Sequence, residues 1–237
     1  MIVSDVIAKS LKKEGIKDIF MLTGYGAMYL NDSIEKEGIK YIAARNEAAA
    51  PMMAEAYAKA KNSVGAVCVT AGPGATNALP GLAEAYVDST PIVVISGQVE
   101  NINTADYYKK LNIRTLGTAE FSITRILKNI TKYSVKLTDP NKSQYEIEKA
   151  IHISKTGRPG PVWIEIPLDI QSKKVIKNKL KKFKPKYKQK NYIKLYKKIY
   201  FKLLNSKKPL FAIGNGLKQS GSKDIFNKIQ KKLNIPY

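Results

Sequence analysis

Short apolar runs alternate, over the first 170 positions, with segments in which apolar residues recur every three or four positions. The runs are typical of strands buried on both faces, and the periodic segments are typical of helices that cover a sheet. This alternation predicts an α/β fold, a parallel sheet flanked by helices. Strands are expected at 18–22, 41–44, 64–70, 91–96, 130–135 and 161–166, and helices at 3–14, 27–37, 46–61, 75–88 and 141–155.

Two local signals refine this pattern. A Gly-Pro-Gly turn is expected at 71–74, directly after a buried strand. The dipeptide Pro80-Gly81 is expected to interrupt the helix at 75–88, because proline and glycine both weaken a helix interior.

The pattern changes after residue 170. Residues 171–191 lose the apolar periodicity and gain Lys, Gln and Asn, which predicts a basic linker. Beyond it we expect helices at 192–204 and 224–233 and a strand at 209–213, followed by Gly214-Asn215-Gly216. Residues 192–237 are too few to bury a core of their own. The chain is therefore predicted to hold one domain at 1–170 and the incomplete start of a second α/β domain at 192–237.

Positive charge is concentrated in the last part of the chain. From Lys173 onwards there are 21 lysines, no arginine and one acidic residue, Asp224, a net +20 of the chain's +22. Such a segment can contact nucleic acid or an anionic membrane surface. However, the lysines are accompanied by many Asn and Ile residues and form no nucleic-acid motif. A compositional bias explains them, so we expect no specific nucleic-acid partner and no membrane partner.

The single cysteine, Cys68, fits a reducing compartment, and neither a signal peptide nor a long apolar span is evident. A cytoplasmic location is therefore expected. Cys68 and Trp163 lie in apolar runs and are predicted to be core residues, whereas His152 is predicted to be a surface or packing residue. One histidine, one cysteine and no clustered carboxylates predict no metal site in this chain.

Three collinear segments carry a family resemblance. Residues 66–99 are AVCVTAGPGATNALPGLAEAYVDSTPIVVISGQV, residues 44–50 are ARNEAAA and residues 156–162 are TGRPGPV. Together they resemble the pyrimidine-binding domain of thiamine-diphosphate enzymes of the acetolactate synthase (acetohydroxyacid synthase) type, large subunit. The resemblance is close over about 1–170. It is weak over 192–237, which is similar to the start of the family's middle domain.

The resemblance implies a site for thiamine diphosphate. In the family, a glutamate that opens a helix bonds N1′ of the aminopyrimidine and promotes loss of the thiazolium C2 proton; Glu47 matches it. Without the resemblance, Glu47 would be a glutamate stabilised by a helix dipole. The other implied cofactor-binding residues lie in glycine loops or at the carboxyl ends of apolar elements, where α/β sheets bind ligands: Gly24, Gly26, Gly72, Pro73, Gly74, Asn77 and Gln98. For Asn77 and Gln98, loop hydrogen bonding is an equal alternative.

Three positions depart from the family pattern. Gly24-Tyr25-Gly26 replaces the Pro-Gly-Gly loop of biosynthetic acetolactate synthases and is more similar to members found in sugar and polysaccharide biosynthesis. Ala119 stands where a glutamine is usual, and Asn46 where a histidine is usual. The acceptor substrate therefore stays open.

The Gly-Asp-Gly segment with which the family binds Mg²⁺ at the cofactor's diphosphate is absent from this chain. Gly214-Asn215-Gly216 instead fits the first glycine turn of the middle domain, where some members bind FAD. The family's site forms between two subunits, so a homo-oligomer, a dimer or tetramer, is expected, and this chain would hold about half a site.

The expected function is the N-terminal part of a carboligase that decarboxylates pyruvate and transfers the acetyl unit to a 2-keto acid or keto sugar, as in branched-chain amino acid biosynthesis. Other interpretations are a 2-keto acid or acyl-CoA decarboxylase of the same family, half of a split enzyme, a non-catalytic truncated product, or an electrostatic binder that uses the lysines.

Overall fold

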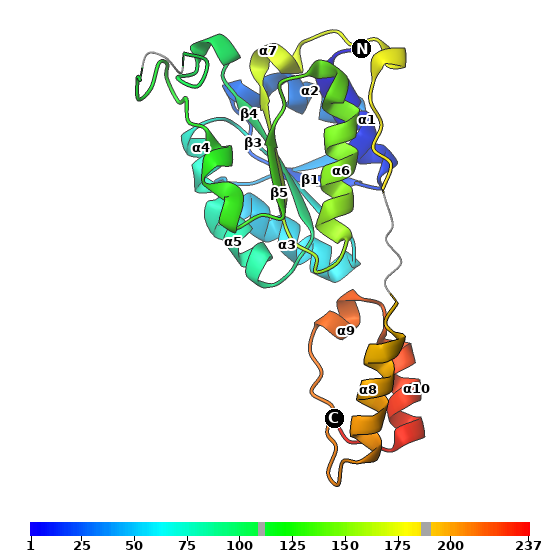
Figure 1. The fold of residues 1–237 in the computed structure, drawn as a ribbon. Coiled ribbons are helices and arrows are strands. Elements are labelled where there is room, and N and C mark those ends of the chain that lie inside the picture. The colour runs from blue at the N-terminus through cyan, green and yellow to red at the C-terminus, as the bar shows by residue number, and fades with distance from the viewer. Residues whose placement is uncertain (109–111, 186–190) are drawn as a thin grey trace. The chain divides into compact units, whose positions relative to one another are not determined.

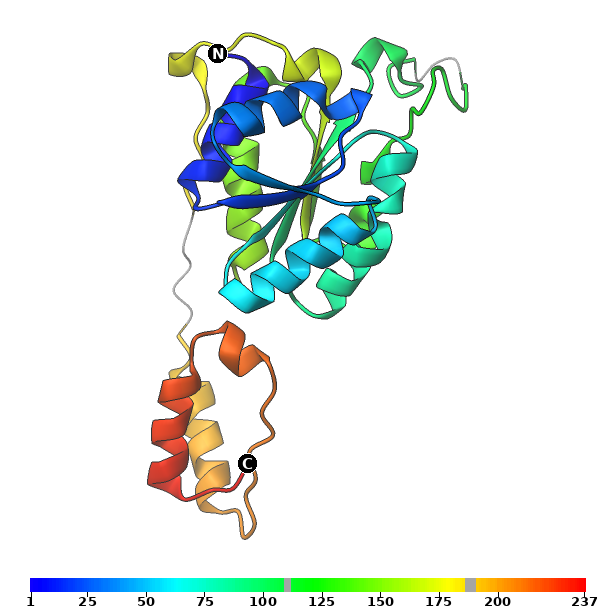
Figure 2. The same cartoon turned by 180° about the vertical axis from the view of Figure 1, so that it is seen from behind.

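The computed structural model describes residues 1–108, 112–185 and 191–237 (Figures 1 and 2). The chain forms two compact units, Met1–Pro185 and Lys186–Tyr237, here called unit 1 and unit 2.

Unit 1 is built on a six-stranded sheet in which every strand pair is parallel. The strand order is β2-β1-β3-β4-β6-β5. Strands β3, β4 and β6 are buried along their whole length, as their unbroken apolar runs predict. The predicted α/β fold with a parallel sheet is thus confirmed. The strands are β1 (Asp18–Met21), β2 (Lys40–Ala43), β3 (Gly65–Val69), β4 (Ile92–Gln98), β5 (Tyr133–Lys136) and β6 (Val162–Pro167).

Helices cover both faces of this sheet (Figures 1 and 2). One face packs against α1 (Val3–Lys13), α2 (Met28–Lys36) and α6 (Ser143–Lys155). The other packs against α3 (Ala49–Lys61), α5 (Leu79–Val87) and the 3₁₀ turns at Ile123–Arg125 and Leu127–Asn129. Neighbouring residues of a strand serve opposite faces, as the pleat requires.

The residues predicted to be core are buried. Trp163 and Cys68 have no exposed surface. His152 is half-buried on α6, and its ring lies 5.3 Å from that of Phe183, so it is a packing residue. A buried side chain of leucine size contributes about 1.5–3 kcal/mol to the stability of such a core.

The helix expected at 75–88 is divided, but not where the sequence predicted. It consists of α4 (Pro73–Asn77) and α5, which join at Ala78. Pro80 lies in the first turn of α5, where a missing N–H costs nothing. The predicted break at Pro80-Gly81 is therefore wrong: proline begins this helix instead of ending it.

Residues 171–185, which the sequence placed in the linker, contact the rest of unit 1. The N–H of Val3 donates to the carbonyl of Lys173 at 3.0 Å, and the N–H of Val175 donates to that of Met1 at 3.1 Å. The Phe183 ring packs edge-on against Tyr145 at 5.6 Å. The helical turn α7 (Leu168–Gln171) leads into the segment, which includes a 3₁₀ turn at Lys177–Lys179. The remaining linker residues 186–190 lie outside the described residues.

Unit 2 contains α8 (Ile193–Leu204), α9 (Gly216–Gln219) and α10 (Lys223–Leu233). The two predicted helices are present, but residues 209–213 do not form the predicted strand. A strand needs a neighbour to pair with, and Phe211 donates its N–H only to the carbonyl of Pro236, at 3.0 Å. Neither α8 nor α10 buries a residue. That unit 2 begins a middle domain stays a prediction.

Within the described parts of the chain, no helix is both long enough and apolar enough to span a bilayer.

Candidate functional site

The loops that hold the predicted site residues meet at the carboxyl edge of the sheet. The chain leaves β1 towards β2 on one side and returns to β3 on the other, so β1 and β3 form a topological switch point. Ligands of open α/β sheets bind at such points, because the two loops diverge there. The loops after β1 and β3 contain Gly24, Gly26 and the turn Gly72-Pro73-Gly74.

Glu47 lies in a turn just before α3 and is half-buried. The turn is closed by Asn46, whose side-chain oxygen accepts the N–H of Ala49 at 2.9 Å, as a capping residue does. Asn77, at the end of α4, donates its Nδ2 to Oε2 of Glu47 at 2.9 Å. Two predicted site residues from separate elements are thus brought into direct contact.

Gly74 faces the other carboxylate oxygen. A Cβ at this position would lie 3.0 Å from Oε1 of Glu47 and 2.6 Å from Cγ2 of Thr70. Only glycine leaves this space open, so the turn can bring its backbone close to the carboxylate.

Thr70, the residue after β3, joins the two glycine loops, although it was not among the site residues expected from the sequence. Its Oγ1 accepts the N–H of Gly26 at 3.1 Å. A Cβ on Gly24 would lie 2.6 Å from Cβ of Thr70. The glycines at 24 and 26 therefore allow the first loop to pack on Thr70. A threonine that directly precedes a glycine turn is the only sequence signal for this role.

Gly72 adopts a positive φ of 56°, which glycine tolerates best. A Cβ here would lie 2.1 Å from the carbonyl oxygen of Ala119. The backbone around Ala119 therefore packs directly on the glycine turn. Ala119 itself has a φ of 58°.

Gln98 is buried at the end of β4, and its amide is engaged inside the protein. Its Nε2 donates to Oε1 of Glu165 and to the carbonyl of Phe121, both at 2.8 Å, and its Oε1 accepts the N–H of Val99 at 2.9 Å. These bonds correspond to the alternative of loop hydrogen bonding. They also show Glu165, a buried carboxyl that the sequence did not single out because it lies within an apolar strand.

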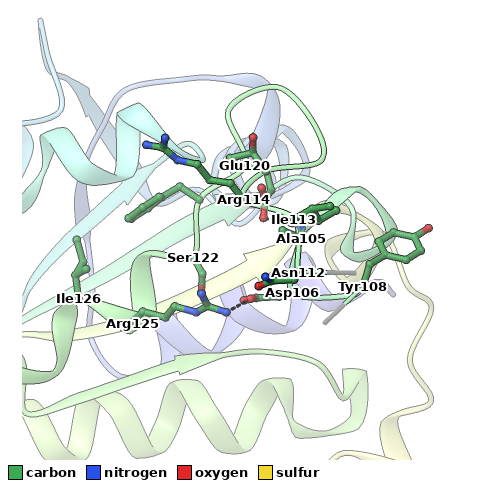
Figure 3. A pocket seen from close by; sticks show the side chains of 12 residues that line it. Ala105, Asp106, Tyr108, Asn112, Ile113, Arg114, Glu120, Ser122, Arg125 and Ile126 are labelled. Atoms are coloured by element: carbon green, nitrogen blue, oxygen red, sulfur yellow. Dashed lines mark hydrogen bonds and ion pairs between the residues drawn. The ribbon is translucent and has the colours of Figure 1, made fainter. Parts of the chain in front are cut away.

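A cavity of about 490 Å³ lies beside this segment (Figure 3). Its wall includes Glu120, Phe121 and Ser122, and the ion pair between Arg125 and Asp106 crosses one side.

The carboxylate beside the glycine turn has chemistry that suits an aminopyrimidine. Within the described residues, no three His, Cys, Asp or Glu side chains converge. One carboxylate, with an oxygen held by Asn77 and next to a turn whose backbone comes close to it, can share a proton with the ring nitrogen of a flat heterocycle.

Residues 1–116 match the N-terminal TPP-binding domain of thiamine pyrophosphate enzymes. Over these residues the chain is similar to the thiamine pyrophosphate enzymes. Thiamine pyrophosphate is another name for thiamine diphosphate, so the expected resemblance is confirmed.

Among enzymes of this family, the chain is similar to acetolactate synthases. It is 36% identical over 98% of its length to the acetolactate synthase large subunit of Lactococcus lactis, and 34% identical over 98% to that of Buchnera aphidicola. It is 32% identical over 92% of its length to acetolactate synthase 2, chloroplastic, of Nicotiana tabacum. The chain spans 40% of the length of the two bacterial relatives and 32% of the plant one.

Proposed function

We propose that this chain supplies the aminopyrimidine half of a thiamine-diphosphate site in a carboligase of the acetolactate synthase type. The observation that supports this most directly is the half-buried Glu47 carboxylate, held at Oε2 by Asn77 and facing Gly74 with Oε1. When bound, thiamine diphosphate supplies a carbanion-like nucleophile for attack on a 2-keto acid.

Each residue has a distinct part in this proposal. Glu47 shares a proton with the ring nitrogen through its free oxygen. Asn77 fixes the direction of that oxygen by bonding the other one. Gly72 lets the backbone at Ala119 pack on the turn, Gly74 lets the turn approach the carboxylate, and Gly24 and Gly26 let the first loop pack on Thr70.

The remaining features of the complete enzyme rest on the family resemblance. They are a pyruvate-type 2-keto acid substrate, a homo-oligomer and Mg²⁺ at the diphosphate, with FAD in the middle domain as in some members. The predicted binding segments for Mg²⁺ and FAD lie outside unit 1. A cytoplasmic location stays a prediction from the single cysteine.

Binding of the pyrimidine can be tested on the 237-residue chain. The probe is 4-amino-5-hydroxymethyl-2-methylpyrimidine, followed through the backbone amide resonances by NMR. We expect a dissociation constant on the order of 1 mM, because half a site binds a small fragment weakly. The largest shifts should fall at 47, 72, 74 and 77 and should be lost in Glu47→Gln. Equal shifts in Glu84→Gln, an exposed carboxylate on α5, and in Glu47→Gln would contradict the proposal.

Activity is best tested in a chimera, because residues 1–237 align with only 40% of the Lactococcus lactis large subunit. The aligned 40% of the Lactococcus lactis large subunit would be replaced by residues 1–237. With pyruvate, thiamine diphosphate and Mg²⁺, the chimera should form acetolactate, and Glu47→Gln should remove turnover while leaving the circular dichroism spectrum unchanged. Formation of acetaldehyde instead would favour a decarboxylase. A folded, cofactor-binding chimera without product would count against catalysis.

A further inference from the structure

Gln171 is the last residue of α7, and the sequence placed it at the start of the basic linker. It is fully buried. Its Nε2 donates to the carbonyl of Gly26 at 2.6 Å and to the carbonyl of Ile166 at 2.7 Å. Because both neighbours are acceptors, the amide nitrogen must face them, and the amide oxygen must point away. Gln171 therefore connects the end of β6 to the first glycine loop inside the protein.

Both polar backbone groups of Gly26 are held in this way. Its N–H donates to Oγ1 of Thr70 at 3.1 Å, and its carbonyl accepts the amide of Gln171. A Cβ on Gly97, near the end of β4, would lie 1.8 Å from the Gly26 carbonyl oxygen, so the strand backbone packs directly on this carbonyl. Gly97 is the register partner of Ile166. The two carbonyls that Gln171 bonds therefore lie beside paired positions of β4 and β6.

Gln171 is itself fixed by its surroundings. Its backbone carbonyl accepts Oγ of Ser4 at 3.2 Å, and Ser4 is fully buried on α1. The turn α7 packs beside α1 and α2 (Figure 1). The side-chain Oε1 of Gln171, in contrast, has no hydrogen-bond partner among the described residues. A buried acceptor without a donor is unfavourable, so the contribution of this side chain lies in the two bonds that its Nε2 donates.

Thr70 connects the position of Gly26 to the second glycine loop. Its Oγ1 accepts the Gly26 N–H, and a Cβ on Gly74 would lie 2.6 Å from its Cγ2. Gly74 in turn faces Oε1 of Glu47. If Gly26 moved away, Thr70 would lose the bond that selects its side-chain rotamer, and its methyl group could turn against Gly74. The place of the first loop therefore affects the space beside the Glu47 carboxylate.

We propose that Gln171 is a positioning residue of the candidate site, which holds the first glycine loop on Thr70 through the carbonyl of Gly26. Its consequence for cofactor binding rests on the proposed function. The restraint on the loop belongs to the free chain and needs no cofactor.

Gln171→Met tests this restraint, because methionine keeps the length of the side chain and removes both donors. Hydrogen exchange of the free chain, followed by NMR, is the measurement. The N–H of Ala27 donates to the carbonyl of Gly24 at 3.0 Å and closes the loop. This amide and that of Gly26 should exchange at least about tenfold faster than in wild type, beyond any common change in the β3 amides. Affinity for the pyrimidine probe should fall by about 3–10-fold.

Ser154→Ala is the matched control. Ser154 is fully buried on α6 and donates its Oγ to the carbonyl of Ile151 at 2.8 Å. The control therefore also removes a buried bond to a backbone carbonyl, but on a helix that holds none of the predicted site residues. It should leave the exchange at Gly26 and the affinity for the pyrimidine unchanged.

The wild-type chain provides a second measurement that needs no variant. The side-chain amide hydrogens of Gln171 should exchange at least about tenfold slower than those of a solvated glutamine amide. Exchange at the solvated rate would overturn the inference. A folded Gln171→Met with unchanged exchange at Gly26, or with unchanged affinity where wild type binds the pyrimidine, would also overturn it. Slow exchange at Gln171 and faster exchange at Gly26 in the variant, with no pyrimidine binding by wild type, would count against the proposed function alone.

Discussion

Asn77 donates its Nδ2 to Oε2 of Glu47 at 2.9 Å, although Glu47 lies in the turn before α3 and Asn77 at the end of α4, on either side of β3 in the chain. The bond fixes one carboxylate oxygen and leaves the other beside Gly74. Asn77 thus acts on a ligand through Glu47, a role that its place in the sequence did not reveal.

Loss of this bond should weaken binding without unfolding the chain. A hydrogen bond to a charged group contributes about 1.5–3 kcal/mol, but Asn77 is exposed, so we expect Asn77→Ala to weaken pyrimidine binding by about 3–10-fold. Titration by NMR measures this. Gln144→Ala is the control, because Gln144 makes the same kind of amide-to-carboxylate bond, to Glu148 on α6, and should leave affinity unchanged.

A methyl group at position 74 should disturb the carboxylate. In Gly74→Ala the new Cβ meets both Thr70 and Glu47 within 3.0 Å, so one of them must move. We expect a loss of about 1–3 kcal/mol in the free energy of unfolding, typical of overpacking, together with loss of pyrimidine binding. Gly214→Ala is the control, because nothing lies within 4 Å of its Cβ. Equal denaturation midpoints for the two variants would show that the turn accommodates a Cβ at position 74 and would contradict this prediction.

The stability of the chain should depend on pH through Glu165. The pKa is raised from 4.5 to about 7 in the folded protein, so the folded state binds the additional proton between these values. The contribution of Glu165 to stability therefore falls as the pH rises through this window and is constant above it. Urea unfolding should show Glu165→Gln similar to wild type near pH 4.5 and more stable at pH 8, by roughly 3 kcal/mol at most. A constant difference at both pH values would contradict this.

Cys68 should be unreactive while the chain is folded. It has no exposed surface, its Sγ lies 3.5 Å from Oδ1 of Asn31, and burial raises the pKa of its thiol to about 12. Because the thiolate is the reactive form, a thiol reagent at pH 8 should label Cys68 only as fast as the surrounding sheet opens. Rapid labelling in native buffer, with a rate proportional to reagent concentration, would show that β3 is accessible.

The sequence predicts best those segments whose own residues determine their secondary structure. The apolar run at 64–70 can be accommodated in a buried parallel strand, and β3 is that strand. The run at 209–213 has a similar composition, but without a neighbouring strand it stays irregular. Residues 171–185 have no periodicity, yet they pack on unit 1 through backbone bonds that a residue pattern does not show.

Some features of the candidate site could also be predicted from the sequence, and others could not. Glycines in a loop indicate that the backbone approaches another group closely, and the glycines at 24, 26, 72 and 74 each have such a neighbour. The residues they approach, Thr70 and Ala119, are determined by the tertiary fold, and no pattern in the sequence identifies them. The position of Gln98 at the end of a strand could be predicted, but its hydrogen bonds could not, because its partner Glu165 lies 67 residues further along the chain.

The pairing of residues 1–3 with residues 173–175 also bears on how the chain is made. The bridge between Ile2 and Lys174 joins the portions of unit 1 that leave the ribosome first and last. Helix α1 also packs on α6, near the end of the unit. During synthesis β1 to β4 and α2 can associate early, but the part of α1 that packs on α6 stays uncovered until residues 143–155 have emerged, and chaperones would have this interval in which to bind it.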